Sequence, residues 1–361
     1  MTGAKGSVAG SLRLQVSLAQ GRVEGVAISS TRPLHLARVL EGRTVAEALA
    51  LLPLLFSVCG QAQALAGRAA IEAALDLEPD ATSLRARRQA LAAETIAEHS
   101  LTLLRDWAIL AGLPPKLEQA RQIRATLAAL HRPENTEQAR ADLAAFPECD
   151  ALQEVVEAVA EALSHRGLSQ FGGSGVALLP ASAAPILADR LAADEDGSFA
   201  ARPLWQGFPA ETGPFARHAH EPAIAAAGDG LWGRFTARLL DLRAAVALII
   251  PETPERLTIE RLAPLPPCPR DSGSGAGWVE AARGFLLHHV EISGGRILRY
   301  RILAPTEWNF HPDGPLARGL IGCEGSGGAG EGGLAERVRW LATALDPCVA
   351  YEVEVRETAY A

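Results

Sequence analysis

The sequence is poor in lysine and lacks the short motifs that would assign a function directly. Only Lys5 and Lys116 are lysines among its 34 basic lysine and arginine residues. No Gly-Lys-Ser or Gly-Lys-Thr triplet occurs, which excludes a phosphate-binding loop. The formal net charge of −8 at pH 7 does not favour a nucleic-acid surface. The N-terminal residues lead into no apolar signal core, so no export signal is expected.

Cysteine is also scarce, and its spacing excludes a zinc-ribbon site. The five cysteines are Cys59, Cys149, Cys268, Cys323 and Cys348, and no two of them form a Cys-x-x-Cys pair. Their odd number and wide spacing favour free thiols in a reducing compartment over a disulfide framework. We therefore expect a cytoplasmic protein.

One uncharged run, residues 48–67, is about as long as a membrane span. Pro53, Gly60, Gln61 and Gln63 interrupt it, and these residues argue against a helix exposed to lipid. The run is therefore predicted to be a buried helical segment, and no membrane partner is expected.

Apolar periodicity predicts an α+β protein that is mainly helical, with β-hairpins near both ends of the chain. The first hairpin is expected over 12–29, and the second over 284–303 with a turn at 293–295. The expected helical segments are 44–75 with a break near Pro53, 83–111, 115–130, 136–166, 231–250 and 334–345.

The sequence contains no internal repeat and no clear boundary between domains. Its 361 residues suffice for two average domains or one large one, and a single domain over 1–361 is expected. Pro, Ser and Gly are frequent over 263–277, and Gly over 322–333, so both segments are predicted to be flexible loops.

Four separated stretches, in chain order, resemble motifs of the large subunit of nickel–iron hydrogenases. They are Gly21-Arg22-Val23-Glu24-Gly25, the segment 57–66 around Cys59, the block 279–309 with Glu280-Ala281-Ala282-Arg283-Gly284 and Pro305-Thr306-Glu307-Trp308-Asn309, and Asp346-Pro347-Cys348. Weaker support comes from Glu94 to His99, in the place of a histidine-rich helix. The resemblance implies a truncated form of that family's large-subunit fold.

The differences from the family pattern concern the metal ligands. In the family four thiolates hold nickel and iron, and Cys59 and Cys348 match the two that bind nickel terminally. The bridging cysteines are replaced by Ala62 and Tyr351. A bimetallic centre needs bridging thiolates, so the resemblance implies no hydrogen turnover, no stable nickel and no enzymatic activity.

This pattern resembles the HupK/HoxV group of hydrogenase expression/formation proteins. The resemblance implies a non-catalytic scaffold or chaperone that transiently holds the Fe(CN)2(CO) fragment on Cys59 and Cys348. The diatomic ligands already fill half of an octahedron, so two thiolates and one weak ligand could hold the iron. The implied partners are hydrogenase maturation chaperones and the immature large subunit that receives the fragment.

Five further residues are considered around the two thiols. Arg283 matches the family's arginine over the metal site, where a guanidinium can donate hydrogen bonds to a cyanide nitrogen. Glu24 matches a proton-relay glutamate, although a turn-stabilising role fits it equally well. Asp346 is expected to fix the local turn, and His99 to lie nearby. Cys323 is either an accessory thiol for cargo capture or an incidental exposed thiol.

Arg283 and a pair of histidines each have a simpler structural interpretation. Arg283 could be a structural arginine paired with Glu280 or another acid. His218 and His220 could suggest a metal pair, but an exposed loop is the favoured interpretation because no third ligand is evident. Two other functions also remain open. One is a metal-free decoy large subunit that binds assembly chaperones, and the other is a divergent redox enzyme in which Tyr351 and Gln61 stand in as ligands.

Overall fold

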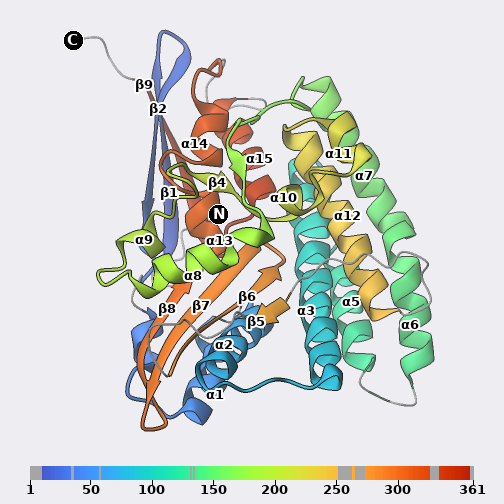
Figure 1. The fold of residues 1–361 in the computed structure, drawn as a ribbon. Coiled ribbons are helices and arrows are strands. Elements are labelled where there is room, and N and C mark those ends of the chain that lie inside the picture. Colours follow the sequence, from blue (N-terminus) through green and yellow to red (C-terminus); the bar gives the residue numbers. More distant parts are fainter. Residues whose placement is uncertain are drawn as a thin grey trace.

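The computed structural model describes residues 10–33, 36–56, 58–130, 132, 135–250, 262–264, 273–325 and 333–357. Long helices lie together on one side of the molecule, and the strands lie on the other (Figure 1). Helix predominates in the described residues, as the sequence predicts.

A three-stranded sheet joins the two ends of the described chain. β1 (Ser11–Ala19) and β2 (Arg22–Ser30) form the predicted N-terminal hairpin. β9 (Ala350–Glu357), which the sequence analysis missed, pairs in parallel with β1. The start of β9 therefore lies beside the start of β1 and the end of β2, and Cys348 lies just before it.

The second sheet has four antiparallel strands in the order β5–β6–β7–β8. They span Leu262–Pro264, Ser274–Ala281, Gly284–Ser293 and Arg296–Leu303. β7 and β8 confirm the second predicted hairpin. The loop predicted over 263–277 is wrong at both ends, where β5 and β6 lie, and its residues 265–272 are outside the described residues. Residues 326–332 of the loop predicted over 322–333 are also outside the described residues.

Close packing against a helix explains the glycines in β6. α2 (Gly60–Ala74) lies on this strand, and a Cβ atom at Gly277 would come within 2.4 Å of the Ala70 nitrogen. At Gly275 it would lie 2.2 Å from the Ala74 nitrogen. Only glycine allows two backbones to approach so closely. A stretch with the composition of a loop is therefore a strand.

α1 (Val45–Leu55) precedes α2 and packs against it. Its start is fixed by a capping box between Thr44 and Glu47. Pro53 lies inside α1, and the chain leaves the helix at Phe56. The predicted break is confirmed, a few residues after the proline. It makes Cys59 the N-cap residue of α2.

The helical bundle contains α3 (Ala81–Leu101), α4 (Ala108–Leu110), α5 (Leu117–Ala129), α6 (Thr136–Ala145), α7 (Asp150–His165) and α12 (Leu231–Ile249). A π-helical turn, Thr102–Trp107, connects α3 to α4. The run predicted over 136–166 is two helices, because the chain forms a 3-10 turn at Phe146–Glu148, which contains Pro147.

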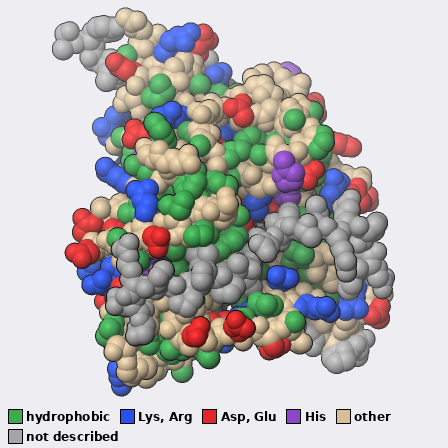
Figure 2. Space-filling view, in the orientation of Figure 1, with side chains coloured by type: hydrophobic (Ala, Val, Ile, Leu, Met, Phe, Trp, Pro, Cys, Tyr) green, Lys and Arg blue, Asp and Glu red, His purple; other side chains and the backbone are tan. Residues whose placement is uncertain are grey.

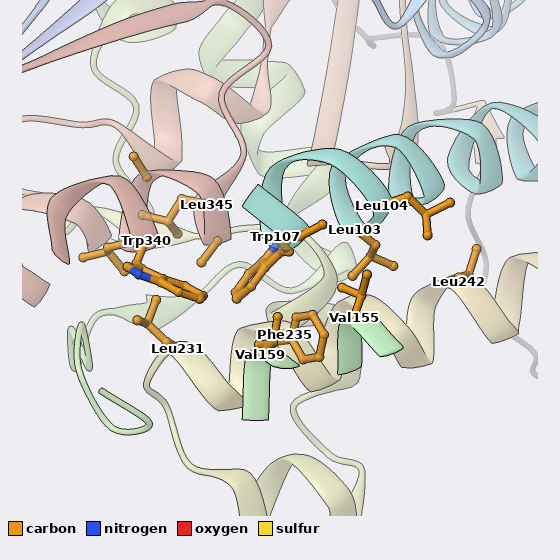
Figure 3. Close-up of a cluster of buried hydrophobic side chains, with 14 of the residues drawn as sticks. Leu103, Leu104, Trp107, Val155, Val159, Leu231, Phe235, Leu242, Trp340 and Leu345 are labelled. Carbon is orange, nitrogen blue, oxygen red and sulfur yellow. The ribbon is translucent and has the colours of Figure 1, made fainter. Parts of the chain in front are cut away.

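The predicted C-terminal helix, α15 (Leu334–Leu345), packs into the core of this bundle. The Trp107 ring centroid lies 4.7 Å from that of Phe235 and 5.6 Å from that of Trp340 (Figure 3). Buried aromatic side chains of this size contribute strongly to core stability. The end of α15, and with it the Asp-Pro-Cys segment, is thereby held firmly.

The shorter elements are η1 (Leu36–Leu40), β3 (Ala177–Leu178), η5 (Ala181–Ala183), α8 (Ala184–Ala192), α9 (Ser198–Ala201), β4 (Ala210–Glu211), α10 (Pro214–His218), α11 (Pro222–Ala227), α13 (Pro305–Asn309) and α14 (Pro315–Leu320). α13 follows β8 directly and carries part of the cavity described below.

The surface mixes charges of both signs. Figure 2 shows acidic and basic side chains interspersed over one face. The uncharged run at 48–67 is divided between α1, of 11 residues, and α2, of 15, each shorter than a bilayer span. In the part of the chain that the structure describes, no helix combines the length and the apolar character needed to cross a membrane.

Candidate metal-fragment site

An inner cavity of about 120 Å³ is lined by both Cys59 and Cys348. Cys59 begins α2, and Cys348 lies between α15 and β9. The polar side chains that share the wall with the two thiols are Arg32, Gln63, Glu94, Glu98, Arg283, Thr306 and Glu307. The fold thus brings thiols from opposite ends of the sequence to one small space.

A chain of neutral hydrogen bonds lies behind Cys59. The Gln63 Nε2 atom lies 3.6 Å from the Cys59 Sγ atom, and Gln63 Oε1 lies 2.9 Å from His288 Nε2. An amide oxygen can only accept, so His288 Nε2 donates and its Nδ1 accepts from the Tyr300 hydroxyl at 2.8 Å. Burial lowers the pKa of His288 to about 3, which keeps the ring neutral. These contacts turn the Gln63 amide toward the thiol.

Glu94 of α3 caps the start of α2. Its carboxylate accepts from the backbone nitrogens of Gln61 at 2.7 Å and Ala62 at 3.0 Å, which a helix start leaves without partners. Burial raises the pKa of Glu94 to about 7. Burial, with Cys348 and Glu94 nearby, raises the pKa of Cys59 to about 12. Cys59 is therefore a neutral thiol at pH 7.

Cys348 is held by a different kind of contact. Its Sγ atom lies 3.3 Å from the Thr306 hydroxyl oxygen of α13. Two residues earlier, Asp346 ends α15 in the left-handed region, with φ 50°. Its carboxylate accepts from Arg238 at 2.9 Å and lies 3.4 Å from the Arg283 Nε atom. Burial works against the charge, but Arg283 and Arg238 hold the pKa of Asp346 below its usual range.

Arg283 lies in the turn between β6 and β7 and lines the cavity. It donates to Glu98 of α3 at 3.1 Å. The alternative of an arginine paired with an acid is confirmed for Glu98, and Asp346 also lies 3.4 Å away, while Glu280 accepts from Arg217 at 2.7 Å. Burial opposes the charge on Arg283, but the attraction of Asp346, Glu98 and both thiols raises its pKa. A permanently charged guanidinium therefore faces the two thiols.

His99 lies behind the cavity wall and is fully buried. Its Nδ1 atom lies 3.1 Å from an Arg238 nitrogen, and its Nε2 atom lies 2.8 Å from Asp241. Arginine can only donate, so Nδ1 accepts and Nε2 carries the proton. Burial lowers the pKa of His99 to about 4. His99 thus orients Arg238, which in turn holds Asp346; it does not touch the cavity.

His218 is not on an exposed loop, which corrects the favoured interpretation of the His218–His220 pair. It is buried, and its Nε2 atom lies 3.0 Å from Asp241. The exposed imidazole of His220 lies 3.4 Å from Glu221. Asp241, on α12, is the partner of His218 and also accepts from Arg217 at 2.8 Å. The sequence signal that could have indicated this burial is an acidic residue between two leucines in a predicted helix.

The structure does not bring Glu24 or Cys323 to the cavity. Glu24 is the extra residue of a β-bulge in the edge strand β2, and its side chain is exposed. It lies six residues before Ser30, where β2 ends, which is about 20 Å at strand spacing. The Cys323 carbonyl accepts from Val23 at 2.9 Å, so this thiol lies beside the same distant part of β2. A short motif match was insufficient to locate Glu24.

An open outer cleft of about 1400 Å³ adjoins the inner cavity. The two spaces share Val58, Glu94, Glu98, Arg283 and Cys348 in their walls. The Cys348 end of the inner cavity therefore communicates with the surface along α3 and β9.

The two positions matched to bridging cysteines lie outside the inner cavity. Ala62 is fully buried in α2, and Tyr351 lines the outer cleft. The Tyr351 hydroxyl lies 3.2 Å from the Thr343 hydroxyl and 3.4 Å from the Arg339 carbonyl, and burial raises its pKa. Among the described residues, no three His, Cys, Asp or Glu side chains are arranged to hold a metal ion.

Three comparisons agree with this architecture. Residues 255–350 match the family model described as nickel-dependent hydrogenase. The chain is 35% identical to the hydrogenase expression/formation protein HupK of Rhizobium leguminosarum bv. viciae, over 97% of this chain and 98% of the relative. It is 31% identical to the hydrogenase expression/formation protein HoxV of Cupriavidus necator, over 94% of each chain.

The fold also matches a solved structure, the nickel–iron–selenium hydrogenase of Desulfovibrio vulgaris Hildenborough in the reduced state. The TM-score is 0.68 at 17% sequence identity, over 92% of this chain and 94% of that chain. This likeness establishes the large-subunit-like fold, and the relatives establish the family. The chain belongs to the HupK/HoxV family of hydrogenase expression/formation proteins.

Proposed function

We propose that this protein is a non-catalytic scaffold in hydrogenase maturation. It holds an Fe(CN)2(CO) fragment transiently on Cys59 and Cys348 and passes it to the immature large subunit. The names of relatives that match nearly the whole chain support a role in hydrogenase formation. The fold supports a site shaped like that of the enzyme it would serve.

The observation that carries this proposal is the pairing of two thiols with a guanidinium in one small cavity. Cys59, Cys348 and Arg283 all line it. The fragment brings three strong ligands of its own, so two soft thiolates and one weak ligand complete its octahedron. Arg283 would donate to a cyanide nitrogen. A bare metal ion would need more protein ligands than these.

The replaced bridging positions argue against a redox enzyme. Ala62 offers no ligand, and the Tyr351 phenol is kept protonated by burial and is hydrogen-bonded away from the inner cavity. A phenol is also a hard ligand and a poor substitute for a bridging thiolate. With only two thiols, the site would bind the fragment less tightly than a mature hydrogenase, which suits release.

The outer cleft suggests where transfer would take place. It opens beside Cys348, so a maturation chaperone or the immature large subunit could approach the fragment from that side. The four described cysteines are free thiols, which fits the reducing cytoplasm proposed for this step.

The test is infrared spectroscopy on protein purified without oxygen from its native host. The expected result is a set of carbonyl and cyanide bands in the wild type that is lost in Cys59→Ala and Cys348→Ala. Cys149→Ala is the matched control, because Cys149 is a partly buried thiol outside the cavity. That variant should keep the bands.

Two results would overturn the proposal. Bands that persist in both cavity variants would show that these thiols do not hold the fragment. A blank wild-type spectrum, with assembly partners still co-purifying, would instead favour the metal-free decoy.

A further inference from the structure

A second guanidinium, that of Arg32, lines the inner cavity. Arg32 follows β2 by two residues, and the end of β2 and the start of β9 lie at the same end of the sheet, on either side of the start of β1. The sheet therefore carries Arg32 to the Cys348 side of the cavity. No motif in the sequence marks this residue.

Arg32 is anchored by one carboxylate. It donates to Glu307 of α13, and 14% of the Arg32 side chain and 15% of the Glu307 side chain are exposed. Among the described residues, Glu307 is the one hydrogen-bond acceptor of the Arg32 guanidinium. The other oxygen of Glu307, Oε2, is buried without a hydrogen-bond partner there. Arg32 lines the cavity, and within the described part of the chain its guanidinium has N–H donors beyond the one that Glu307 accepts.

Both thiols affect the charge of Arg32. Burial opposes the charged form, but Glu307, Cys348 and Cys59 together raise its pKa. The same two thiols raise the pKa of Arg283. Two guanidiniums on separate elements therefore lie close enough to interact electrostatically with both sulfur atoms.

The charge of the proposed cargo explains why two guanidiniums are useful. Iron(II) with two cyanides and one carbonyl is neutral. When it binds, two S–H bonds break, two Fe–S bonds form, both protons pass to solvent, and the fragment loses its weakly held ligands. The bound site then carries two extra negative charges. Leaving such charge unpaired in a buried cavity is costly, so two fixed positive charges are needed to offset it.

Arg283 offers only part of its charge, since it is shared between Glu98 and Asp346. We propose that Arg32 is a second cargo-binding residue, which donates N–H groups to the dithiolate–iron–cyanide unit, while Glu307 is the positioning residue that aims it. This inference rests on the proposed function, and it assigns the charge recognition at that site.

The experiment uses the full-length, reduced protein and a synthetic iron(II) complex that carries two cyanides and one carbonyl. Uptake is measured without oxygen as bound iron, together with the positions of the cyanide bands. Arg32→Ala should take up the complex at least about tenfold more weakly, because it loses hydrogen bonds to a charged group. Arg32→Lys keeps the positive charge but not the planar set of N–H donors of a guanidinium. It should retain part of the uptake with shifted cyanide bands.

Two controls separate recognition from folding. Arg299→Ala removes an arginine that also pairs with a glutamate, Glu291, but on the exposed side of β8, and it should behave as wild type. The double variant Arg32→Ala/Glu307→Ala leaves no unpaired carboxylate and should still show the weakened uptake.

The outcomes distinguish this inference from the proposed function. Uptake and cyanide bands in Arg32→Ala that equal those of wild type would overturn the role of Arg32 and leave the scaffold intact. Wild-type protein that binds no complex would overturn the scaffold itself, and the role of Arg32 with it.

Discussion

The two thiols share a cavity but are supported in different ways. Cys59 begins a helix that Glu94 caps, and neutral groups lie behind its sulfur: the Gln63 amide, then the His288 ring and the Tyr300 hydroxyl. Cys348 follows Asp346, a buried carboxylate held between Arg238 and Arg283. One half of the site rests on hydrogen bonds between neutral groups, and the other half on buried charges.

This difference determines how each half would fail. Buried ion pairs are strongly destabilising when one partner is removed, because the other charge stays behind without compensation. Neutral hydrogen bonds and helix caps contribute less each, about 1 kcal/mol. The Cys348 half should therefore respond most to the loss of a charge, and the Cys59 half should respond less to the loss of one of its contacts.

Asp346→Ala should have the largest effect. The substitution leaves Arg238 and Arg283 without their shared carboxylate and places alanine in the left-handed region. We expect the free energy of unfolding to fall by about 3–5 kcal/mol, measured by urea denaturation. Asp346→Asn is the matched control, because asparagine tolerates this backbone conformation and can still accept from Arg238, so it should lose less. Equal losses in both variants would contradict the role given to the charge.

The sequence predicted the parts of the site that depend on local signals. The resemblance of segment 57–66 identified Cys59, the predicted break near Pro53 separates two helices there, and the Asp-Pro-Cys motif identified Cys348. The features that it missed depend on long-range pairing. Arg32 reaches the cavity only because β9 joins β1 in parallel. The sequence analysis missed β6 because its glycines, which let the α2 backbone approach closely, gave this stretch the composition of a loop. Glu24 was expected near the thiols because of the short match at 21–25, but so short a match does not tell which end of a strand lies near the site.

Acid should have the next largest effect, and it acts on both halves, through His99 on the Cys348 side and His288 on the Cys59 side. The pKa of His99 is lowered to about 4 by burial, against 6.5 for an unperturbed histidine. Between these values the unfolded chain binds a proton that the native ring does not, so stability falls as pH drops from 6.5 to 4. The loss is roughly 3 kcal/mol from this group. His288, with a pKa lowered to about 3, acts in the same direction.

A titration of unfolding free energy against pH measures this loss. His99→Gln is the matched variant, because a glutamine amide can accept from Arg238 and donate to Asp241 without titrating. Its stability should depend less steeply on pH between 6.5 and 4. A slope equal to that of wild type would assign the acid sensitivity to other groups.

Glu94→Gln should have the smallest effect, and it tests the Cys59 half. The amide oxygen can still accept from one of the two backbone nitrogens, those of Gln61 and Ala62, and the lost cap is opposed by the removal of a buried charge, so unfolding free energy should change by no more than about 1 kcal/mol. The negative charge near Cys59 also disappears. Because Glu94 contributes to the raised pKa of Cys59, the thiolate should form at lower pH.

Alkylation of Cys59, followed by mass spectrometry across pH 7–10, measures that shift. Wild-type Cys59 should react at least tenfold more slowly at pH 8 than a cysteine in an unfolded chain, since a pKa of about 12 leaves little thiolate. Glu94→Gln should react faster than wild type, most clearly above pH 7, where Glu94 is ionised. Equal rates would mean that Glu94 does not contribute to the raised pKa of Cys59. In that case the two halves would differ only in their ion pairs, and not in how a neighbouring charge tunes each sulfur.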